Sequence, residues 1–136
     1  MTREERKKEK KKKELEFVNS LSGKRLTSIL KNKFRNTFIW KDFRIKIKNK
    51  RKTDALTGRK LTKTWNLHHI RTDSRFYTDL DEDFYMALNN EQHNVWHIIY
   101  EEVRKDPQYI RKLEESINYA LKLNNYESFI HKKKKD

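Results

Sequence analysis

Residues 84–97 read F-Y-M-A-L-N-N-E-Q-H-N-V-W-H, and this stretch decides the predicted fold. Its first five residues form a short apolar run that is typical of a strand. Asn89 or Asn90 can cap a helix that begins directly afterwards. His93 and His97 lie four residues apart, so this helix carries both rings on one face. The stretch therefore predicts a strand followed at once by a helix with two neighbouring imidazoles.

A second strand is predicted upstream, over residues 61–70, which end in N-L-H-H-I. Neighbouring residues on a strand point to opposite sides, so His68 and His69 cannot have the same role. One of these rings can join His93 and His97 around a single cation, and the other then points toward a substrate. The four histidines predict three metal ligands and one base.

Most of the remaining chain has helical patterns. Residues 15–21 have apolar side chains at helical spacing before Gly23, and residues 3–13 either extend this helix or form a solvated tail. Residues 40–48 fit a helix or, by alternation, a strand; we favour the helix because a strand there has no identifiable partner. The other predicted elements are a helix over 26–34, a turn at 54–58, a loop over 71–83, a helix that ends before Pro107 and a last helix over 108–123.

The size and composition indicate one compact domain with a lean core. The chain has 136 residues, of which 34% are hydrophobic and 40% are charged. Sixteen aromatic side chains argue against general disorder. We expect four segments: a basic helix or tail over 1–23, a basic and mostly helical nucleic-acid-binding segment over 24–53, a core with the histidines over 54–105, and a C-terminal helix with a lysine-rich tail over 106–136.

The charge distribution points to nucleic acid as the partner. Residues 24–63 hold 15 basic and only two acidic side chains, which accounts for nearly all of the net charge of +14. Such a block attracts a polyanion and releases its counterions. A membrane surface is the alternative, but it requires a wide apolar helical face, which this block shows only weakly. The expected contacts are Lys41, Arg44, Lys46, Lys48, Lys50, Arg51, Lys52, Arg59 and Lys60.

Several classes of protein are excluded by what the sequence lacks. There is no cysteine, which removes disulfides, thiolate zinc sites and thiol catalysis. No apolar run is long enough to cross a membrane, and the basic N-terminus lacks the apolar stretch of a signal peptide. We therefore expect a soluble protein of the cytoplasm.

The chain resembles the HNH, or ββα-metal, endonuclease family. The resemblance rests on L-T-G-R-K-L at 56–61, N-L-H-H-I at 66–70 and the stretch 84–97, and the spacing of its histidines is similar to that of colicin-type nuclease domains. It implies an α+β fold that is mostly helical, with an HNH hairpin-helix core. It also implies a metal-dependent endonuclease that hydrolyses phosphodiester bonds, with double-stranded DNA as the expected partner.

The resemblance implies a role for each histidine of the motif. His69 is the general base, and His68, His93 and His97 are metal ligands. An imidazole is largely neutral near pH 7 and can deprotonate water, while a cation stabilises the leaving oxygen. One divalent ion is expected, from among Mg²⁺, Mn²⁺, Ni²⁺ and Zn²⁺; three imidazoles favour the softer ions, whereas Mg²⁺ is the most available in cells.

Two departures from the family pattern stand out. The family's middle asparagine, which holds the base in place, falls at Phe84 in this chain. The candidate replacements are Asn89, Asn90, Asp83 or a backbone carbonyl. The zinc knuckle of many family members is absent because its thiolates are, so the terminal helices are expected to brace the site.

A second functional class has to be weighed against the nuclease. It is a noncatalytic basic nucleic-acid-binding protein in which the histidines form a structural or metal-holding cluster. We also expect Trp65 and Trp96 to lie in the core, the acidic loop 73–83 to be solvated, His131 to have no catalytic role, and the Lys132–Lys135 run to make nonspecific contacts.

Overall fold

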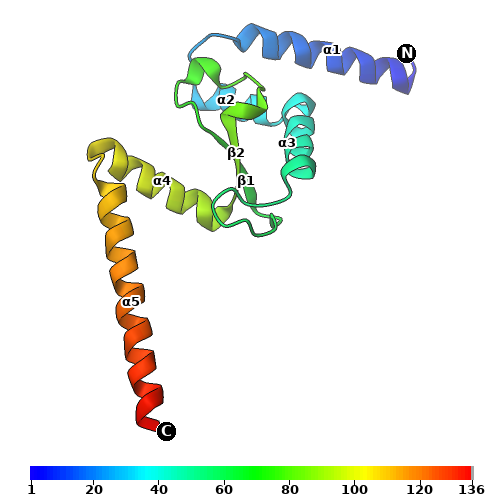
Figure 1. Cartoon of the computed structure of the whole chain (residues 1–136). Helices are drawn as coiled ribbons and strands as arrows, with labels where there is room; N and C mark the ends of the chain where they lie inside the picture. The colour runs from blue at the N-terminus through cyan, green and yellow to red at the C-terminus, as the bar shows by residue number, and fades with distance from the viewer. Residues whose placement is uncertain (136) are drawn as a thin grey trace. The chain divides into compact units, whose positions relative to one another are not determined.

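The structure, a computed structural model, describes the backbone of residues 1–135 and the side chains of residues 1–126. Over this range the chain is α+β, as predicted (Figure 1). Along the sequence, three α-helices precede one antiparallel pair of strands and two follow it. The elements are α1 (Arg3–Leu21), α2 (Ser28–Arg35), α3 (Phe38–Arg51), β1 (Trp65–His69), β2 (Tyr85–Asn89), α4 (Asn90–Lys105) and α5 (Tyr109–Lys135), with short 3₁₀ helices at Ser74–Phe76 and Glu82–Phe84.

The chain divides into two compact units, Met1–His93 and Asn94–Asp136. The sequence predicted one compact domain overall, and here each unit has its own pattern of burial. Helix α4 contributes no buried residue, and in α5 the side chains of Ile117 and Leu121 are about half exposed. The described side chains of the second unit are therefore all half-buried or exposed. Within the described residues, no helix has the length and apolar character needed to span a bilayer.

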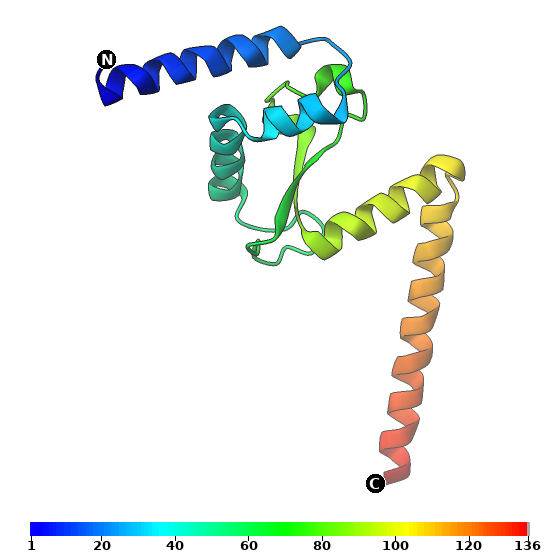
Figure 2. The ribbon, with the colours of Figure 1, turned by 180° about the vertical axis from the view of Figure 1, so that it is seen from behind.

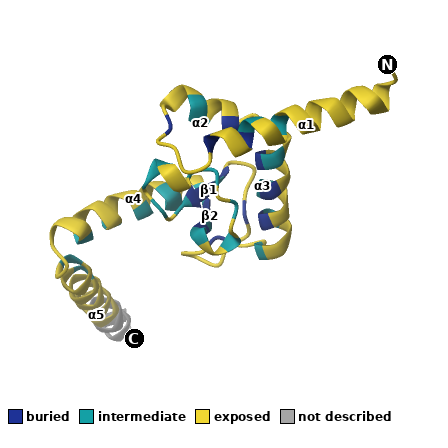
Figure 3. Ribbon diagram, turned by 90° about the horizontal axis from the view of Figure 1, so that it is seen from above, coloured by how far each residue is buried: buried dark blue, intermediate teal, exposed yellow. Residues whose placement is uncertain are grey.

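Helix α1 includes the charged residues 3–13, which settles the alternative between helix and tail. Thr2 and Glu5 form a capping box, in which the Thr2 hydroxyl accepts from the Glu5 amide and the Glu5 carboxylate accepts from the Thr2 amide. The helix ends at Leu21, and Gly23 takes a positive φ of 73° just beyond it. The first turns of α1 are exposed, and only its last part reaches the core (Figure 3).

Residues 38–51 form the helix α3, so the favoured alternative for this segment is confirmed. The Thr37 hydroxyl caps it by accepting from the Trp40 amide. Trp40, Phe43 and Ile47 are buried on one face, while Ile45 is 58% exposed. The alternation of residues 43–48 therefore reflects a helix with one isolated surface isoleucine.

Strands β1 and β2 pair in antiparallel register, with Trp65 opposite Asn89 and His69 opposite Tyr85. The predicted first strand was longer, over 61–70. Helix α3 runs alongside the hairpin (Figures 1 and 2). Strand alternation gives the hairpin one face toward α3 and an opposite face that carries His68. The core of this unit consists of Val18, Leu21, Leu26, Phe34, Trp40, Phe43, Ile47, Leu61, Trp65, Leu67, Tyr85 and Ala87.

The predicted turn at 54–58 is built around a buried carboxylate. Asp54 is 2% exposed, and its Oδ1 accepts hydrogen bonds from the amides of Leu56 and Thr57, each at 2.8 Å. Its Oδ2 accepts from the amide of Asn89 at 2.7 Å. Gly58 takes a positive φ of 70° and closes the turn. Asp54 thus ties this turn to the last residue of β2, directly before α4.

Candidate metal centre and basic surface

The two adjacent histidines of β1 lie in different surroundings. His68 is 7% exposed, and its ring faces His93 of α4. The ring of His69 lies among aromatic side chains of α3 and of the 71–83 loop. The strand geometry predicted this separation.

His68 and His93 come together across the hairpin and the helix that follows it. The Nδ1 atom of His68 is 3.1 Å from the Nε2 atom of His93, and the ring centroids are 5.1 Å apart. At this distance the two nitrogens can share a proton or ligate one cation. Two nitrogens bound to one ion at about 2.1 Å are separated by about 3.0–3.4 Å, so the observed spacing fits a shared metal.

His97 follows His93 by one turn of α4, and it completes the predicted set of ligands. The ligand atoms of His68, His93 and His97 all lie within 4.8 Å of one another. His68 is buried, His93 is half-buried and His97 is exposed, so the cluster is open to solvent on the His97 side. The three predicted ligands can therefore bind a metal ion together, and three neutral imidazoles are a donor set suited to Zn²⁺ or Ni²⁺.

The ring of His69 is held between two aromatic rings. It stacks on Tyr77 with centroids 4.1 Å apart and on Trp40 with centroids 5.4 Å apart, nearly parallel to both. Its Nε2 lies 3.1 Å from the carbonyl oxygen of Tyr77. A carbonyl only accepts hydrogen bonds, so Nε2 carries the proton in the neutral ring and Nδ1 is the basic atom.

The surroundings of His69 keep its ring neutral at pH 7. Burial lowers the pKa of His69 most strongly; the hydrogen bond to Tyr77 raises it, and the nearby charges of Arg35 and Lys31 lower it further. Together they lower the pKa from 6.5 to about 4. A neutral imidazole with a fixed tautomer can accept a proton, and it can equally serve as a packed aromatic side chain.

The two asparagines considered as orienting residues have other partners. The side chain of Asn89 accepts from the amide of Thr62 at 2.8 Å and donates to the carbonyl of Lys60 at 3.1 Å. Asn90 accepts from the side chain of Asn66 at 3.2 Å. Asn89 therefore ties the end of β2 to the segment before β1, and Asn90 ties the start of α4 to β1.

The backbone amide of Asp83 donates to the carboxylate of Asp81 at 3.0 Å, and among the described residues no hydrogen bond joins the Asp83 carboxylate to His69. Among the described side chains and backbone, the hydrogen-bond partner of His69 is the carbonyl of Tyr77, which corresponds to the backbone alternative. Nothing in the local sequence identified Tyr77, because it approaches His69 through the fold of the 71–83 loop.

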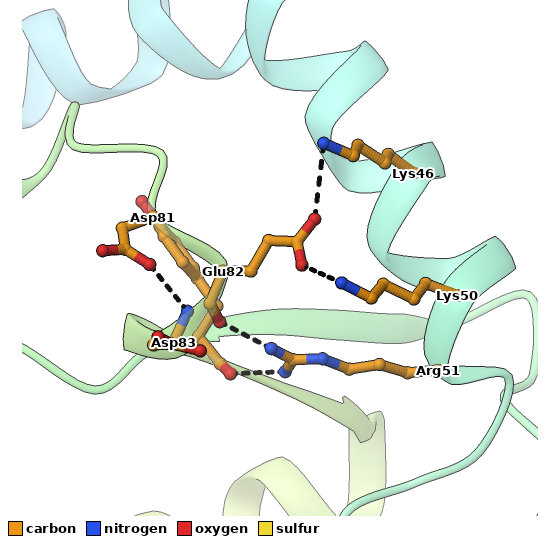
Figure 4. A network of polar contacts seen from close by, with 7 residues as sticks. Lys46, Lys50, Arg51, Asp81, Glu82 and Asp83 are labelled. Carbon is orange, nitrogen blue, oxygen red and sulfur yellow. Dashed lines mark hydrogen bonds and ion pairs between the residues drawn. The ribbon is translucent and has the colours of Figure 1, made fainter.

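Two residues that were predicted to contact nucleic acid make hydrogen bonds within the fold. Arg44 donates to the carbonyl of Trp65 at 2.6 Å and lies over its ring, and burial lowers the pKa of Arg44. Arg51 donates to the carbonyls of Tyr85 and Glu82, each at 2.5 Å (Figure 4). Both guanidinium groups therefore join α3 to the hairpin.

Two further cations of α3 are paired with one carboxylate. Lys50 Nζ lies 2.5 Å from Glu82 Oε2, and Lys46 Nζ lies 3.4 Å from Glu82 Oε1 (Figure 4). The hydrogen bond from Lys50 lowers the pKa of Glu82; burial raises it, and the hydrogen bond from Lys46 and the charges of both lysines lower it further, so the net direction is downward. Part of the positive charge of α3 is thus compensated.

The other predicted basic contacts lie at or near the surface. Lys41 and Lys52 are exposed and Lys48 is half-buried, and Lys52 ends α3 with a left-handed φ of 61°. Arg59 and Lys60 line a pocket of about 290 Å³. The other lining residues are Thr57, Thr62, Thr64, Asn89, Asn90, Glu91 and Gln92.

Of the two tryptophans expected in the core, one is there. Trp65 is 6% exposed, which confirms that prediction. The prediction for Trp96 is wrong, because its side chain is only half-buried and stacks on Tyr100 with centroids 4.8 Å apart. The predicted loop over 71–83 holds the two short 3₁₀ helices, and its acidic side chains are exposed or half-buried. The side chains of His131 and of the Lys132–Lys135 run lie outside the described residues.

No protein-family model, no curated protein and no solved structure matches this chain.

Proposed function

We propose that this chain is a metal-dependent endonuclease of the HNH type, acting on phosphodiester bonds in DNA. The observation that carries the proposal is the convergence of three imidazoles from β1 and α4, beside a fourth that follows His68 directly in the sequence. This is the division into ligands and base that hydrolysis of a phosphodiester requires.

His68, His93 and His97 would hold the ion. The spacing of 3.1 Å between the first two nitrogens supports this assignment, as does the clustering of all three ligand atoms. A bound divalent cation would polarise the phosphoryl group and stabilise the 3′-oxygen as it leaves.

His69 would accept the proton from the attacking water at Nδ1. Its Nε2–H is directed at the Tyr77 carbonyl, which fixes the tautomer that this role needs. Water would form the new bond to phosphorus while the bond to the 3′-oxygen breaks, and the proton would pass to the imidazole. The excess of basic residues over 24–63 would hold the DNA backbone with little base specificity.

The alternative is a noncatalytic nucleic-acid-binding protein, and a specific observation favours it. His69 is stacked between Trp40 and Tyr77, as a structural aromatic side chain is. In that case the His68–His93 contact is a hydrogen bond, or holds a metal that only stabilises the fold.

A plasmid-cleavage assay separates the two functions. Supercoiled DNA is incubated with the full chain and Mg²⁺, Mn²⁺, Ni²⁺ or Zn²⁺ in turn, and nicked product is measured. We expect the wild type to nick with at least one ion, and His69→Gln to be about 10²- to 10⁴-fold slower. His131→Gln is the matched control and should cut at the wild-type rate.

Binding measurements show whether the loss is chemical. His69→Gln should keep the metal affinity and the DNA affinity of the wild type within about threefold, and circular dichroism should show that it is folded. A wild-type protein that retards the plasmid but nicks it with none of the four ions would establish the noncatalytic alternative.

A further inference from the structure

Two cations of α2 converge on the aromatic ring that covers His69. Lys31 Nζ lies 5.2 Å from the centroid of the Tyr77 ring, and Arg35 Nη1 donates to the Tyr77 hydroxyl at 2.9 Å. The two residues are one helical turn apart, so both side chains leave the same side of α2. Tyr77 in turn stacks on His69. One tyrosine therefore brings two positive charges beside the candidate base.

The charge of α2 is not compensated by acidic groups. The helix holds three basic residues and no acidic one. Among the side chains of residues 1–126, no carboxylate oxygen lies within 4.0 Å of Lys31 or Arg35. In α3, by contrast, Lys46 and Lys50 are paired with Glu82.

Both side chains have hydrogen-bonding capacity left for a ligand. The Lys31 ammonium has three donors, and its known contact is with the face of a ring. Arg35 has five N–H donors, of which it directs some to Tyr77 and Asn32. Phosphate oxygens are strong acceptors for both groups, and contacts of this kind fix the position of a nucleic-acid backbone without reading its bases.

We propose that α2, rather than α3, is the principal phosphate-binding surface, with Lys31 and Arg35 holding the DNA backbone beside His69. The assignment rests on the proposed function and deepens it, because it places the substrate strand on the His69 side of the hairpin. The sequence-based expectation covered both residues within the 24–53 segment but did not name them among the individual contacts.

The test compares two double variants of equal charge. Lys31→Gln/Arg35→Gln removes the α2 pair but keeps long side chains that can still donate to Tyr77. Lys41→Gln/Lys48→Gln removes two cations of α3. Fluorescence anisotropy with a labelled DNA duplex, in EDTA and over a range of salt concentrations, gives the Kd and its salt dependence. Melting curves show that each variant is folded.

We expect the α2 variant to bind about 10- to 100-fold more weakly at 0.1 M salt. The slope of log K against log salt should fall by roughly 1.8, which corresponds to two lost phosphate contacts. The α3 variant should change Kd by less than about threefold. An α2 variant that binds like the wild type, or an α3 variant that loses as much affinity, would overturn the assignment.

Failure of this inference is distinguishable from failure of the proposed function, because binding in EDTA does not depend on cleavage. If the wild type never cuts DNA but the α2 variant binds DNA more weakly, the phosphate-binding surface is supported and the nuclease proposal is rejected. If the wild type cuts DNA and the α2 variant binds DNA as well as the wild type does, the nuclease proposal is supported and the phosphate-binding surface is rejected.

Discussion

The Nδ1 atom of His68 lies 3.1 Å from the Nε2 atom of His93, although 25 residues separate them in the sequence. The contact joins the first strand of the hairpin to the helix that follows the second strand. With His97 one turn further along α4, the same small region gathers three nitrogen ligands.

Removal of either His68 or His93 should abolish binding of a divalent ion. In the wild type, Zn²⁺ or Ni²⁺ at about 100 times its Kd should stabilise the folded state by about 2.7 kcal/mol and raise the melting temperature. His68→Ala and His93→Ala should lose this rise, while His131→Ala should retain it. Calorimetric titration measures the Kd directly, and an unchanged Kd in His68→Ala would exclude this centre.

Stability should fall in mild acid because of His69. The pKa of His69 is lowered to about 4 in the folded protein, mainly by burial, whereas the unfolded chain titrates near 6.5. Between these values the unfolded state binds more protons, so the free energy of unfolding decreases as the pH falls from 6.5 to 4. The loss at pH 5 is about 2 kcal/mol, and at pH values well above 6.5 the ring is neutral in both states and contributes no dependence.

Urea unfolding at pH 7.5 and pH 5 measures this effect. His69→Phe keeps a ring between Trp40 and Tyr77 but cannot titrate. Its free energy of unfolding should therefore fall less between pH 7.5 and pH 5 than that of the wild type, by about 2 kcal/mol. The same loss in both proteins would assign the acid sensitivity to other groups.

Much of the fold could be predicted from local patterns, because helix caps and apolar spacing act over a few residues. The helix over residues 38–51 and the order of strand, strand and helix are both present, and the histidine cluster forms where the spacing indicated. Trp96 shows the limit of this reasoning. Its spacing indicates an apolar helical face, but spacing does not say whether another element covers that face.

The contacts that could not be predicted join residues that are far apart in the sequence. Tyr77 reaches His69 through the loop, Lys31 and Arg35 reach Tyr77 from α2, and Arg51 reaches the carbonyl of Tyr85. The local sequence around each of these residues does not distinguish it from an ordinary surface side chain. Their roles are set by packing between elements, which single-sequence patterns do not report.

Arg51 should contribute more to stability than the neighbouring Lys50. Arg51→Ala removes the side-chain donor to the carbonyl of Tyr85 and one of two donors to the carbonyl of Glu82, which keeps the Tyr85 amide, at a cost of about 1–3 kcal/mol. Lys50→Ala removes an exposed ion pair with Glu82, which should cost less because solvent screens exposed pairs. Arg51→Lys should not restore stability, because one ammonium cannot replace a planar fork. Chemical denaturation gives the three values, and equal losses for Arg51→Ala and Lys50→Ala would contradict this role.

Asp54 should support both the fold and the metal centre. Its carboxylate binds the 54–58 turn and the amide of Asn89, the last residue before α4. Asp54→Asn replaces one acceptor oxygen with a donor that faces an N–H group, so we expect a loss of about 2–3 kcal/mol. Because α4 carries His93 and His97, the variant should also bind the ion more weakly. Asp42→Asn, an exposed position on α3, is the matched control and should change neither quantity.

The contribution of Asp54 has a defined dependence on pH. Burial raises the pKa of its carboxyl group, but the hydrogen bonds from Asn89, Thr57 and Leu56 outweigh this effect and lower the pKa below 3.8. The folded state therefore holds the ionised form more strongly than the unfolded chain does. The resulting stability is present above the unfolded pKa near 4 and is lost as the pH falls through the folded value. Between pH 5 and pH 2, the free energy of unfolding should fall more steeply with decreasing pH in the wild type than in Asp54→Asn. An equal fall in both proteins would show that the folded state does not favour the ionised carboxylate.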